Sequence, residues 1–378
     1  MASARGVGAV RVSWDQVFAW RMGRQFVDPR GGADAVAVVG RLAGVQTQVT
    51  SAAETAVALR TTQGKPGAVT KALGEKKLLK TWAMRGTLHA LTPDVAAGVL
   101  SLMGSARTWE KPSWTKNFGA TPQDIEALVK AVGEILDGAI LTRDELVSAI
   151  VAEPRFHPLE EQLRSGWGAL LKPLAWQGAL CHGPADGTSV TFASPARLIP
   201  GWRGIPEPDV AAPEVISAYL GAYGPATPET FDAWLSRGSI RKPILRRWFS
   251  ELGDRLTEVE VEGRKGYIRT EDADELAATA PARSVRLLGA FDQYVLGPGT
   301  GDTALLSADH RAKVSRTAGW ISPLVLINGR IAGTWEVVDT DLIVTMFDNA
   351  DAPLPELQDE AAHVARAMGT SPLIVTTE

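Results

Sequence analysis

Three times along the chain, a helical stretch is followed by two short strands that are joined by a turn. The strand pairs are identified by alternating apolar and polar residues around a turn signal, and they span residues 77–91, 179–194 and 256–270. The three units share almost no sequence identity, so the repeat is one of architecture. Helices followed by a β-hairpin form the winged-helix pattern. The sequence therefore predicts three winged-helix units in tandem.

The pattern changes at about residue 284. The remaining segments, 286–297, 320–347 and 372–377, are predicted to be mainly strands, with one helix near 354–368 that ends at Gly369. The predicted fold class is α+β, with a small β-rich domain after the three winged-helix units. The predicted boundaries are residues 1–118, 119–206, 207–283 and 284–378.

Several helix starts and turns are marked by local signals. Ser13 with Gln16 and Thr142 with Glu145 have the spacing of capping boxes, and Thr121 precedes a proline at a helix start. A single helix is predicted near 160–177. The hairpin turns are predicted at Arg85-Gly86, at the Pro-Ala-Asp-Gly sequence beginning at residue 184, and at Glu262-Gly263.

Composition excludes several classes of protein. No apolar run approaches the roughly 18 residues that a membrane span needs, and the N-terminal residues contain no stretch of signal-peptide type. The single cysteine, Cys181, excludes an internal disulfide and fits a reducing compartment. Five scattered histidines show no spacing typical of zinc ligands. We therefore expect a cytoplasmic protein without a membrane partner, a metal or another cofactor.

The net charge of −4 does not by itself indicate a nucleic-acid-binding protein. Basic residues are nevertheless concentrated at 65–85, 237–247 and 307–316. A basic patch on an acidic body attracts phosphate, because the local field matters more than the total charge. From the last two stretches we predict DNA contacts by Arg241, Lys242, Arg246, Arg247, His310, Arg311, Lys313 and Arg316. The alternative is that these stretches are ordinary solvated surface.

Two glutamines stand ahead of a predicted helix in the sequence GVQTQVTSAAE, residues 44–54. Ser51 and Glu54 have capping-box spacing, so the helix is predicted to start at Ser51. Gln46 and Gln48 then lie in extended backbone, where residues i and i+2 point to the same side. Two carboxamides on one side offer donors and acceptors that can hold a water molecule. Alternatively, both are ordinary polar residues, one of them capping backbone groups.

Six segments resemble the AlkZ-type tandem winged-helix DNA glycosylases, which unhook interstrand crosslinks and remove bulky alkylated guanines. They are WRMGRQ (20–25), GVQTQVTSAAETAVALR (44–60), RGTLHAL (85–91), AYGPATPETFDAW (222–234), LLGAFDQYVLG (287–297) and INGRIAGTWEV (327–337). The resemblance covers nearly the whole chain. It implies a C-shaped arrangement of the winged-helix units and a C-terminal β-barrel-like domain. It also implies that Gln46 and Gln48 are catalytic, with Thr47 at a middle position that is apolar in the family.

The resemblance implies a monofunctional glycosylase that acts on double-stranded DNA carrying N7-alkylguanine, including bulky natural-product adducts, crosslinks and 7-methylguanine. Because no lysine stands beside the glutamine pair in the sequence, no AP-lyase activity is expected. Arg85, Thr87 and His89 in the first hairpin either face DNA or are structural, whereas Asp292 and Tyr294 are predicted to be structural. The alternative function is a non-catalytic winged-helix regulator. Such regulators are usually short dimers, whereas three wings and a further domain on one chain favour a monomer.

Overall fold

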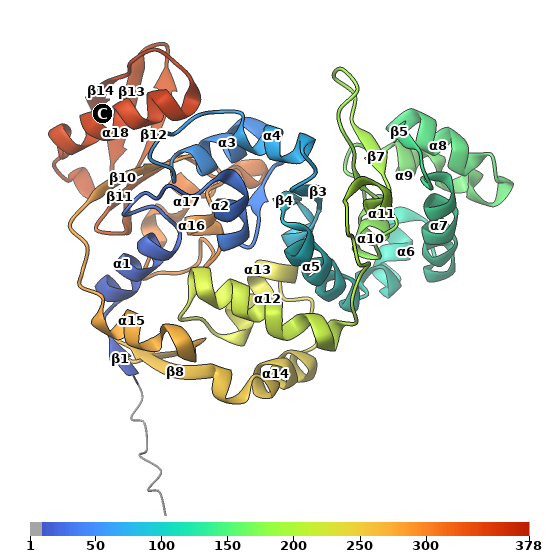
Figure 1. The fold of residues 1–378 in the computed structure, drawn as a ribbon, viewed down its shortest axis with the longest axis horizontal. Helices are drawn as coiled ribbons and strands as arrows, with labels where there is room; N and C mark the ends of the chain where they lie inside the picture. The colour runs from blue at the N-terminus through green and yellow to red at the C-terminus, as the bar shows by residue number, and fades with distance from the viewer. Residues whose placement is uncertain (1–9, 378) are drawn as a thin grey trace, which may run out of the picture.

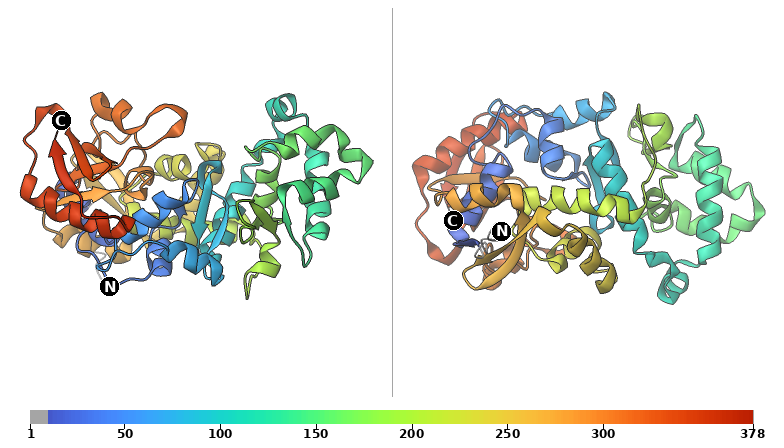
Figure 2. Two further views of the ribbon diagram at one scale, coloured as in Figure 1. Left: turned by 90° about the horizontal axis from the view of Figure 1, so that it is seen from above. Right: turned by 60° about the horizontal axis from the view of Figure 1, so that its bottom comes forward.

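The computed structural model describes residues 10–377 and has an α+β fold with three separate sheets. Residues 119–206 lie at one end of the long axis, and the C-terminal sheet with α18 (Leu354–Met368) lies at the other end (Figure 1). Two further views show the same arrangement (Figure 2). The predicted absence of a signal peptide concerns largely residues 1–9, which lie outside the described part. Within residues 10–377, no helix is both long and apolar enough to cross a membrane.

Residues 10–118, the described part of the segment predicted as the first unit, contain most of the elements around the glutamine pair; the segments are called units here after their predicted boundaries. The elements of the first unit are β1 (Val10–Val12), α1 (Trp14–Arg24), α2 (Ala35–Arg41), β2 (Val45–Gln46), α3 (Thr50–Ala58), α4 (Ala68–Gly74), β3 (Leu79–Trp82), β4 (Leu88–Leu91), α5 (Pro93–Ser105) and α6 (Pro112–Phe118). The capping box of Ser13 and Gln16 is confirmed at the start of α1. β1 pairs in parallel with β8 of the third unit, so this strand joins two units that are distant in sequence.

The second unit is mainly helical around a short hairpin. Its elements are α7 (Pro122–Ile135), β5 (Ile140–Thr142), α8 (Arg143–Val151), α9 (Glu160–Arg164), α10 (Leu171–Trp176), β6 (Cys181–His182), β7 (Thr191–Ala193) and α11 (Pro195–Leu198). The helix starts predicted at Thr121 and Thr142 are confirmed as capping boxes. The single helix predicted near 160–177 is wrong. Between α9 and α10, Gly168 has a φ of 61°, which is incompatible with a continuous helix.

The first two hairpins combine into one six-stranded sheet with the order β2-β4-β3-β6-β7-β5. β3 and β4 pair with Thr81 opposite His89, and the two hairpins meet where Lys80 lies opposite His182. The sequence does not predict this junction, because β6 has only two residues and therefore carries no periodicity. The shared sheet places the glutamine strand β2 at one edge.

The third unit has four helices and the longest hairpin of the three units. Its elements are α12 (Pro208–Tyr223), α13 (Pro228–Ser236), α14 (Lys242–Glu251), β8 (Leu256–Val261), β9 (Arg264–Arg269) and α15 (Ala273–Ala278). The predicted hairpin turn at Glu262-Gly263 is confirmed, and both residues have positive φ, as tight hairpin turns require. Pro243 lies in the first turn of α14, where a missing N–H costs no hydrogen bond.

The C-terminal domain is a five-stranded sheet in sequential order, and α18 packs against it. Its elements are β10 (Val285–Leu288), α16 (Gln293–Leu296), α17 (Arg311–Val314), β11 (Leu324–Ile327), β12 (Arg330–Val338), β13 (Asp341–Met346), α18 and β14 (Ile374–Thr377). Within the described strands, no pairing joins β10 to β14, so the expected barrel-like closure is not seen. The strand predicted over 286–297 ends at Leu288, because Asp292 caps α16.

A buried ion pair joins the first unit to the C-terminal domain. Arg60, which follows α3, donates two hydrogen bonds of 2.7 Å to the two carboxylate oxygens of Asp292, and neither side chain is exposed. Asp292 also accepts from the N–H of Tyr294, whose hydroxyl donates to the Gly329 carbonyl. The prediction that Asp292 and Tyr294 are structural is confirmed. The ion pair also fixes the end of α3 that is distant from the glutamine pair.

Candidate active site

The backbone is extended at Gln46, as predicted, but β2 ends there, and Gln48 lies in a bend between β2 and α3. Gln46 lies in β2 opposite His89 of β4, and the N–H of Thr47 donates to the Leu88 carbonyl at 2.8 Å. That bond joins the residue after Gln46 to the residue before His89, so Gln46 and His89 themselves are a non-hydrogen-bonded pair. Side chains of a non-hydrogen-bonded antiparallel pair are closer together than those of a bonded pair.

The two carboxamides have different surroundings. Gln46 is 8% exposed, and within residues 10–377 no hydrogen bond engages its carboxamide. Gln48 is exposed, and its Oε1 accepts a long hydrogen bond of 3.4 Å from the N–H of Leu88. Gln48 thus closes the end of the β2–β4 ladder, as the alternative of a backbone-capping residue predicts for one of the two. The carboxamide of Gln46 remains free for a ligand.

The predicted capping box after the pair is wrong. α3 starts at Thr50, and its N-cap residue, Val49, has no side-chain cap. Glu54 instead accepts hydrogen bonds from the N–H groups of Val69 and Thr70 and from the Thr70 hydroxyl. Because a carboxylate is stabilised by free N–H groups at a helix start, Glu54 binds the beginning of α4. α3 is therefore fixed against its neighbour close to the glutamines.

Thr47 is buried, at 1% exposure, on the opposite face of the strand from Gln46. Its hydroxyl has no hydrogen-bonding partner among the described residues. A side chain in this place makes packing contacts, so either Thr47 or the apolar residue of the resembled family can occupy it. Thr47 does not alter the face that carries Gln46.

Of the three candidates in the first hairpin, His89 is buried, whereas Arg85 and Thr87 are partly exposed and use polar atoms within the protein. Arg85 donates through Nη1 to the Trp234 carbonyl at 3.1 Å and holds the hairpin tip against α13, while its Nη2 is buried. Burial lowers the pKa of Arg85 to about 10. The Thr87 hydroxyl donates to the Met84 carbonyl. His89 has no exposed surface, which contradicts a contact with the DNA backbone.

The basic stretch of the third unit is exposed on α14 and just before it. Arg241, Lys242 and Arg246 are exposed, and no ion pair involves them among the described residues. Arg247 is different, because its guanidinium pairs with Asp209 and approaches Glu251. The structure therefore leaves three of the four predicted cations free for phosphate.

The C-terminal basic stretch contains the short helix α17. Arg311, Lys313 and Arg316 are exposed on or just after α17. His310 is 9% exposed, stacks on Phe347 and bonds to Asp348 at 2.9 Å, which contradicts its assignment as a DNA contact. The three remaining cations are available on the surface.

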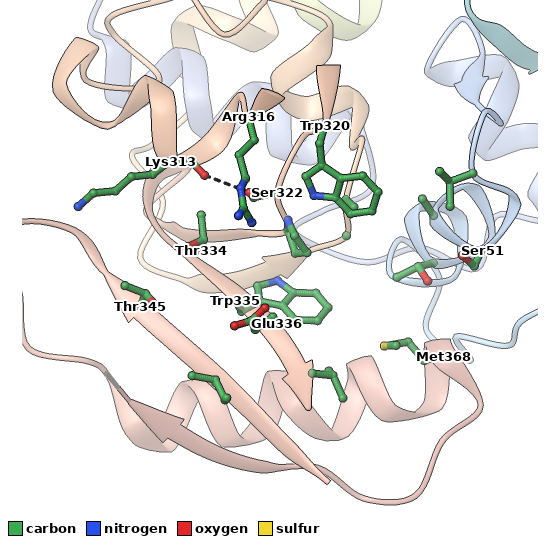
Figure 3. A pocket seen from close by; sticks show the side chains of 18 residues that line it. Ser51, Lys313, Arg316, Trp320, Ser322, Thr334, Trp335, Glu336, Thr345 and Met368 are labelled. Carbon is green, nitrogen blue, oxygen red and sulfur yellow. Dashed lines mark hydrogen bonds between the residues drawn. The ribbon is translucent and has the colours of Figure 1, made fainter. Parts of the chain in front are cut away.

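A cavity of about 550 Å³ lies between α3, with the preceding Val49, and the C-terminal sheet, and neither glutamine is among its lining residues. Val49 and Ser51 line one side, and Lys313, Arg316 and Trp320 also line it. Figure 3 shows Trp320 between Arg316 and the α3 residue Ser51. Trp320 is 42% exposed and packs edge-on against Phe291. The sequence reasoning missed Trp320, because nothing in its local sequence distinguishes it from a packing tryptophan.

No group of three or more His, Cys, Asp or Glu side chains within the described chain could hold a metal ion. Cys181 and His182 are buried neighbours in β6, and burial raises the pKa of the Cys181 thiol well above its usual range. A thiol that stays protonated is a poor ligand and a poor nucleophile. The chemistry that the site offers is that of neutral amides.

Comparisons with known proteins agree on one family. The sequence model described as "DNA glycosylase AlkZ-like" matches residues 39–369. The chain is 57% identical over 368 residues to the "Interstrand DNA cross-link repair glycosylase" of Streptomyces sahachiroi, covering 97% of this chain and 99% of that protein. The structure of this chain is similar to the solved structure of DNA glycosylase AlkZ from the same organism, with a TM-score of 0.96 and 56% sequence identity. The match covers 98% of this chain and 100% of that chain.

Proposed function

The chain belongs to the AlkZ-like family of DNA glycosylases, and from this premise we propose that it hydrolyses the N-glycosidic bond of N7-alkylguanine in double-stranded DNA. Its substrates on this proposal are interstrand crosslinks, bulky natural-product adducts and 7-methylguanine. Release of such adducts would serve DNA repair, or self-resistance in a producer of a DNA-alkylating compound. One observation carries the proposal, namely that no hydrogen bond within residues 10–377 engages the carboxamide of Gln46, which stands two residues from Gln48.

The substrate explains why neutral groups suffice. Alkylation at N7 makes the guanine cationic, so the base leaves as a neutral molecule without a general acid. The transition state resembles an oxocarbenium ion, as in glycoside cleavage. An oriented carbonyl dipole stabilises the charge that develops on the sugar, and a held water is positioned to attack. A neutral site also avoids burying a fixed charge beside a cationic base.

The surroundings of the two glutamines support a division of roles. Neither the oxygen nor the NH₂ of Gln46 has a hydrogen-bonding partner in the described part of the chain, so the carboxamide can hold the attacking water and turn its carbonyl toward the sugar. Gln48 has its oxygen toward the Leu88 N–H, which leaves its NH₂ group as a donor toward solvent. On this proposal Gln46 contributes more to the chemical step, and Gln48 orients the water or the lesion.

Two further features of the molecule favour the binding of a large, negatively charged ligand. The cavity lined by Val49, the residue after Gln48, gives room for a bulky substituent and carries aromatic and cationic side chains. Exposed cations on α14 and α17 are suited to phosphates, and we propose DNA contacts by Arg241, Lys242, Arg246, Arg311, Lys313 and Arg316. We retain the predicted division into three winged-helix units and a C-terminal domain, in a C-shaped monomer.

The reaction is tested with a duplex that carries one 7-methylguanine. The proposal predicts release of the free base and an abasic site that alkali then cleaves. A regulator would bind the same duplex and release nothing, so binding without release would reject the proposed activity.

We expect no AP-lyase activity, because the proposed nucleophile is water and not an amine. After base excision the abasic strand should stay intact, and borohydride should trap no protein–DNA adduct. A trapped adduct would contradict the prediction. Lys313, which lines the cavity, is the first residue to replace in that case, because loss of trapping in Lys313→Ala would identify it as the amine.

A triple change of Arg311, Lys313 and Arg316 to alanine should weaken binding to damaged and undamaged duplexes alike. Each phosphate contact that is lost reduces the slope of log affinity against log salt by about 0.9. Filter binding across a salt series measures that slope. Excision by saturating enzyme in a single turnover should be less affected.

The matched control changes Arg164, Arg197 and Arg255 to alanine, since each pairs with a carboxylate on the surface. Their charges are already compensated locally, so the salt slope should not change. Equal salt slopes for the wild-type protein and the 311–316 variant would show that Arg311, Lys313 and Arg316 are ordinary solvated residues and do not contact phosphates.

A further inference from the structure

Trp320 is an aromatic side chain that the fold leaves open to the cavity between α3 and the C-terminal sheet. Of the twelve tryptophans, all of which lie within residues 10–377, only Trp320 and Trp167 are exposed. A tight turn holds the backbone of Trp320, because its N–H donates to the Thr317 carbonyl and its carbonyl accepts from the Arg316 N–H. The place of the ring is therefore fixed, although the ring itself is exposed.

Contacts with the protein leave part of the Trp320 indole free. The aromatic ring paired with it among the described residues is that of Phe291, with ring centroids 4.9 Å apart and ring planes at 75°. In such an edge-on pair the rings do not lie face to face, so Phe291 covers at most one face of the indole. Because 42% of the residue is exposed and the residue lines the cavity, a flat ligand can stack on the uncovered part.

The other side chains of the cavity suit a flat, apolar ligand. The apolar lining residues include Ala52, Pro323, Trp335, Val337, Ile343 and Met368. Figure 3 shows Trp335 and Met368 in the same cavity as Trp320. The volume of about 550 Å³ lies in the range of about 300–1,000 Å³ that is usual for small-molecule sites. Apolar and aromatic side chains with a few charged ones are also the usual lining of such sites.

The cavity lies next to the glutamine pair without containing it. Val49, which lines the cavity, directly follows Gln48, and consecutive Cα atoms are about 3.8 Å apart. A base held at the glutamines and a group in the cavity therefore occupy neighbouring places. Lys313 and Arg316, two of the proposed phosphate contacts, line the same cavity, so it faces the surface that we propose for DNA.

We propose that Trp320 is a specificity-determining residue, whose indole stacks on a planar aromatic substituent carried by N7 of the guanine. The inference rests on the proposed function for the place of the guanine, and it adds the class of substituent. A flat aromatic group is favoured over a saturated group of the same size, because only the aromatic group can stack on an indole face. The methyl group of 7-methylguanine is too small to reach the ring and gains nothing from it.

The competing interpretation is that Trp320 stacks on an ordinary DNA base beside the lesion. Aromatic side chains stack on every base, because each base has a π-face. The two interpretations differ in which lesions respond to the loss of Trp320. Stacking on a neighbouring base contributes equally whatever N7 carries, whereas stacking on the substituent contributes only when the substituent is aromatic.

The test measures the dissociation constants of three duplexes, which carry one N7-methyl-, N7-benzyl- or N7-(cyclohexylmethyl)guanine. Benzyl and cyclohexylmethyl groups have the same number of carbon atoms, so they differ in aromaticity and not in carbon count. A 2′-fluorine on the sugar disfavours the oxocarbenium-like transition state and keeps the base attached during the measurement. The wild-type protein should bind the benzyl duplex about 2- to 10-fold more tightly than the cyclohexylmethyl duplex, the range that an aromatic pair adds beyond its buried area.

Trp320→Ala should weaken binding of the benzyl duplex about 5- to 100-fold, the range for loss of one aromatic stacking platform. Binding of the methyl duplex should stay unchanged. Trp320→Phe keeps a ring and should retain most of the preference for the benzyl duplex. Equal weakening of all three duplexes by Trp320→Ala would assign Trp320 to a neighbouring base and overturn the proposal, as would unchanged binding of the benzyl duplex.

The matched control is Trp167→Ala. Trp167 is 82% exposed, lies between α9 and α10 of the second unit and does not line the cavity. We expect no change in binding of any of the three duplexes. If Trp167→Ala weakened binding of the benzyl duplex as much as Trp320→Ala, the effect would not come from the cavity and the proposal would fail.

The binding measurement separates this inference from the proposed glycosylase function, because it does not require excision. If the wild-type protein releases 7-methylguanine but binds the benzyl and cyclohexylmethyl duplexes equally, the proposed function stands and the role of Trp320 is rejected. If the benzyl preference depends on Trp320 but no base is released from an unfluorinated duplex, the stacking site stands and the proposed function is rejected.

Discussion

Replacing Gln46 with alanine should lower the single-turnover excision of 7-methylguanine about 10- to 1000-fold, the range for removing one oriented dipole or water-holding group. The carboxamide of Gln46 is the free one of the pair, so its loss removes both the carbonyl dipole and a site for the water. Affinity for the lesion duplex should change little, because the proposed phosphate contacts lie on α14 and α17.

Gln48→Ala should lower the excision rate less than Gln46→Ala does, nearer to the 10-fold end of that range. The reason is that the Gln48 oxygen already accepts a hydrogen bond from the Leu88 N–H. Gln123, an exposed glutamine on α7, provides the control for a glutamine-to-alanine change. Quenched time courses with enzyme in excess give the rates for all three variants. Rates of Gln46→Ala and Gln123→Ala that equal the wild-type rate would remove Gln46 from the chemistry.

Replacing Asp292 with alanine should reduce the free energy of unfolding by about 3–5 kcal/mol, because it leaves the guanidinium of Arg60 buried without its partner. The change also removes the N-cap of α16. Arg60→Met with Asp292→Leu removes both charges and should recover much of the loss. Urea denaturation measures the three free energies.

An exposed ion pair supplies the control. Lys265 and Glu258 pair at 2.7 Å on the third hairpin, with side chains 69% and 43% exposed. Glu258→Ala should reduce the free energy of unfolding far less than Asp292→Ala does, since solvent already screens the exposed pair. Equal losses for Asp292→Ala and Glu258→Ala would show that burial of the Arg60 pair adds nothing to stability.

Local signals in the sequence predicted much of the secondary structure. The capping boxes at Ser13 and Thr142, the hairpins and the extended backbone at Gln46 depend on residues within a few positions of each other. The capping box at Ser51 failed because Glu54 binds another helix, 15 residues later in the chain. A spacing rule cannot distinguish a carboxylate that caps its own helix from one that caps a neighbour.

The parts of the site that depend on burial were not predictable. Arginine and histidine are residue types that often contact DNA, so the sequence favours that role for Arg85, His89 and His310. Only the folded structure shows that the guanidinium of Arg85 and the two imidazoles bond within the protein or are buried. The pairing of His89 with Gln46 joins strands 43 residues apart, and no local pattern encodes that register. Trp320 comes next to α3 through packing of the C-terminal domain, for the same reason.

The most direct test of the central claim is chromatographic detection of free 7-methylguanine from an alkylated duplex, with binding measured on the same duplex. The account predicts that the wild-type protein releases the base, and that the Gln46→Ala/Gln48→Ala variant binds the duplex with similar affinity but releases base at close to the spontaneous rate. Equal release by the two proteins would contradict catalysis by the glutamine pair, and binding without release by the wild-type protein would contradict the glycosylase activity itself.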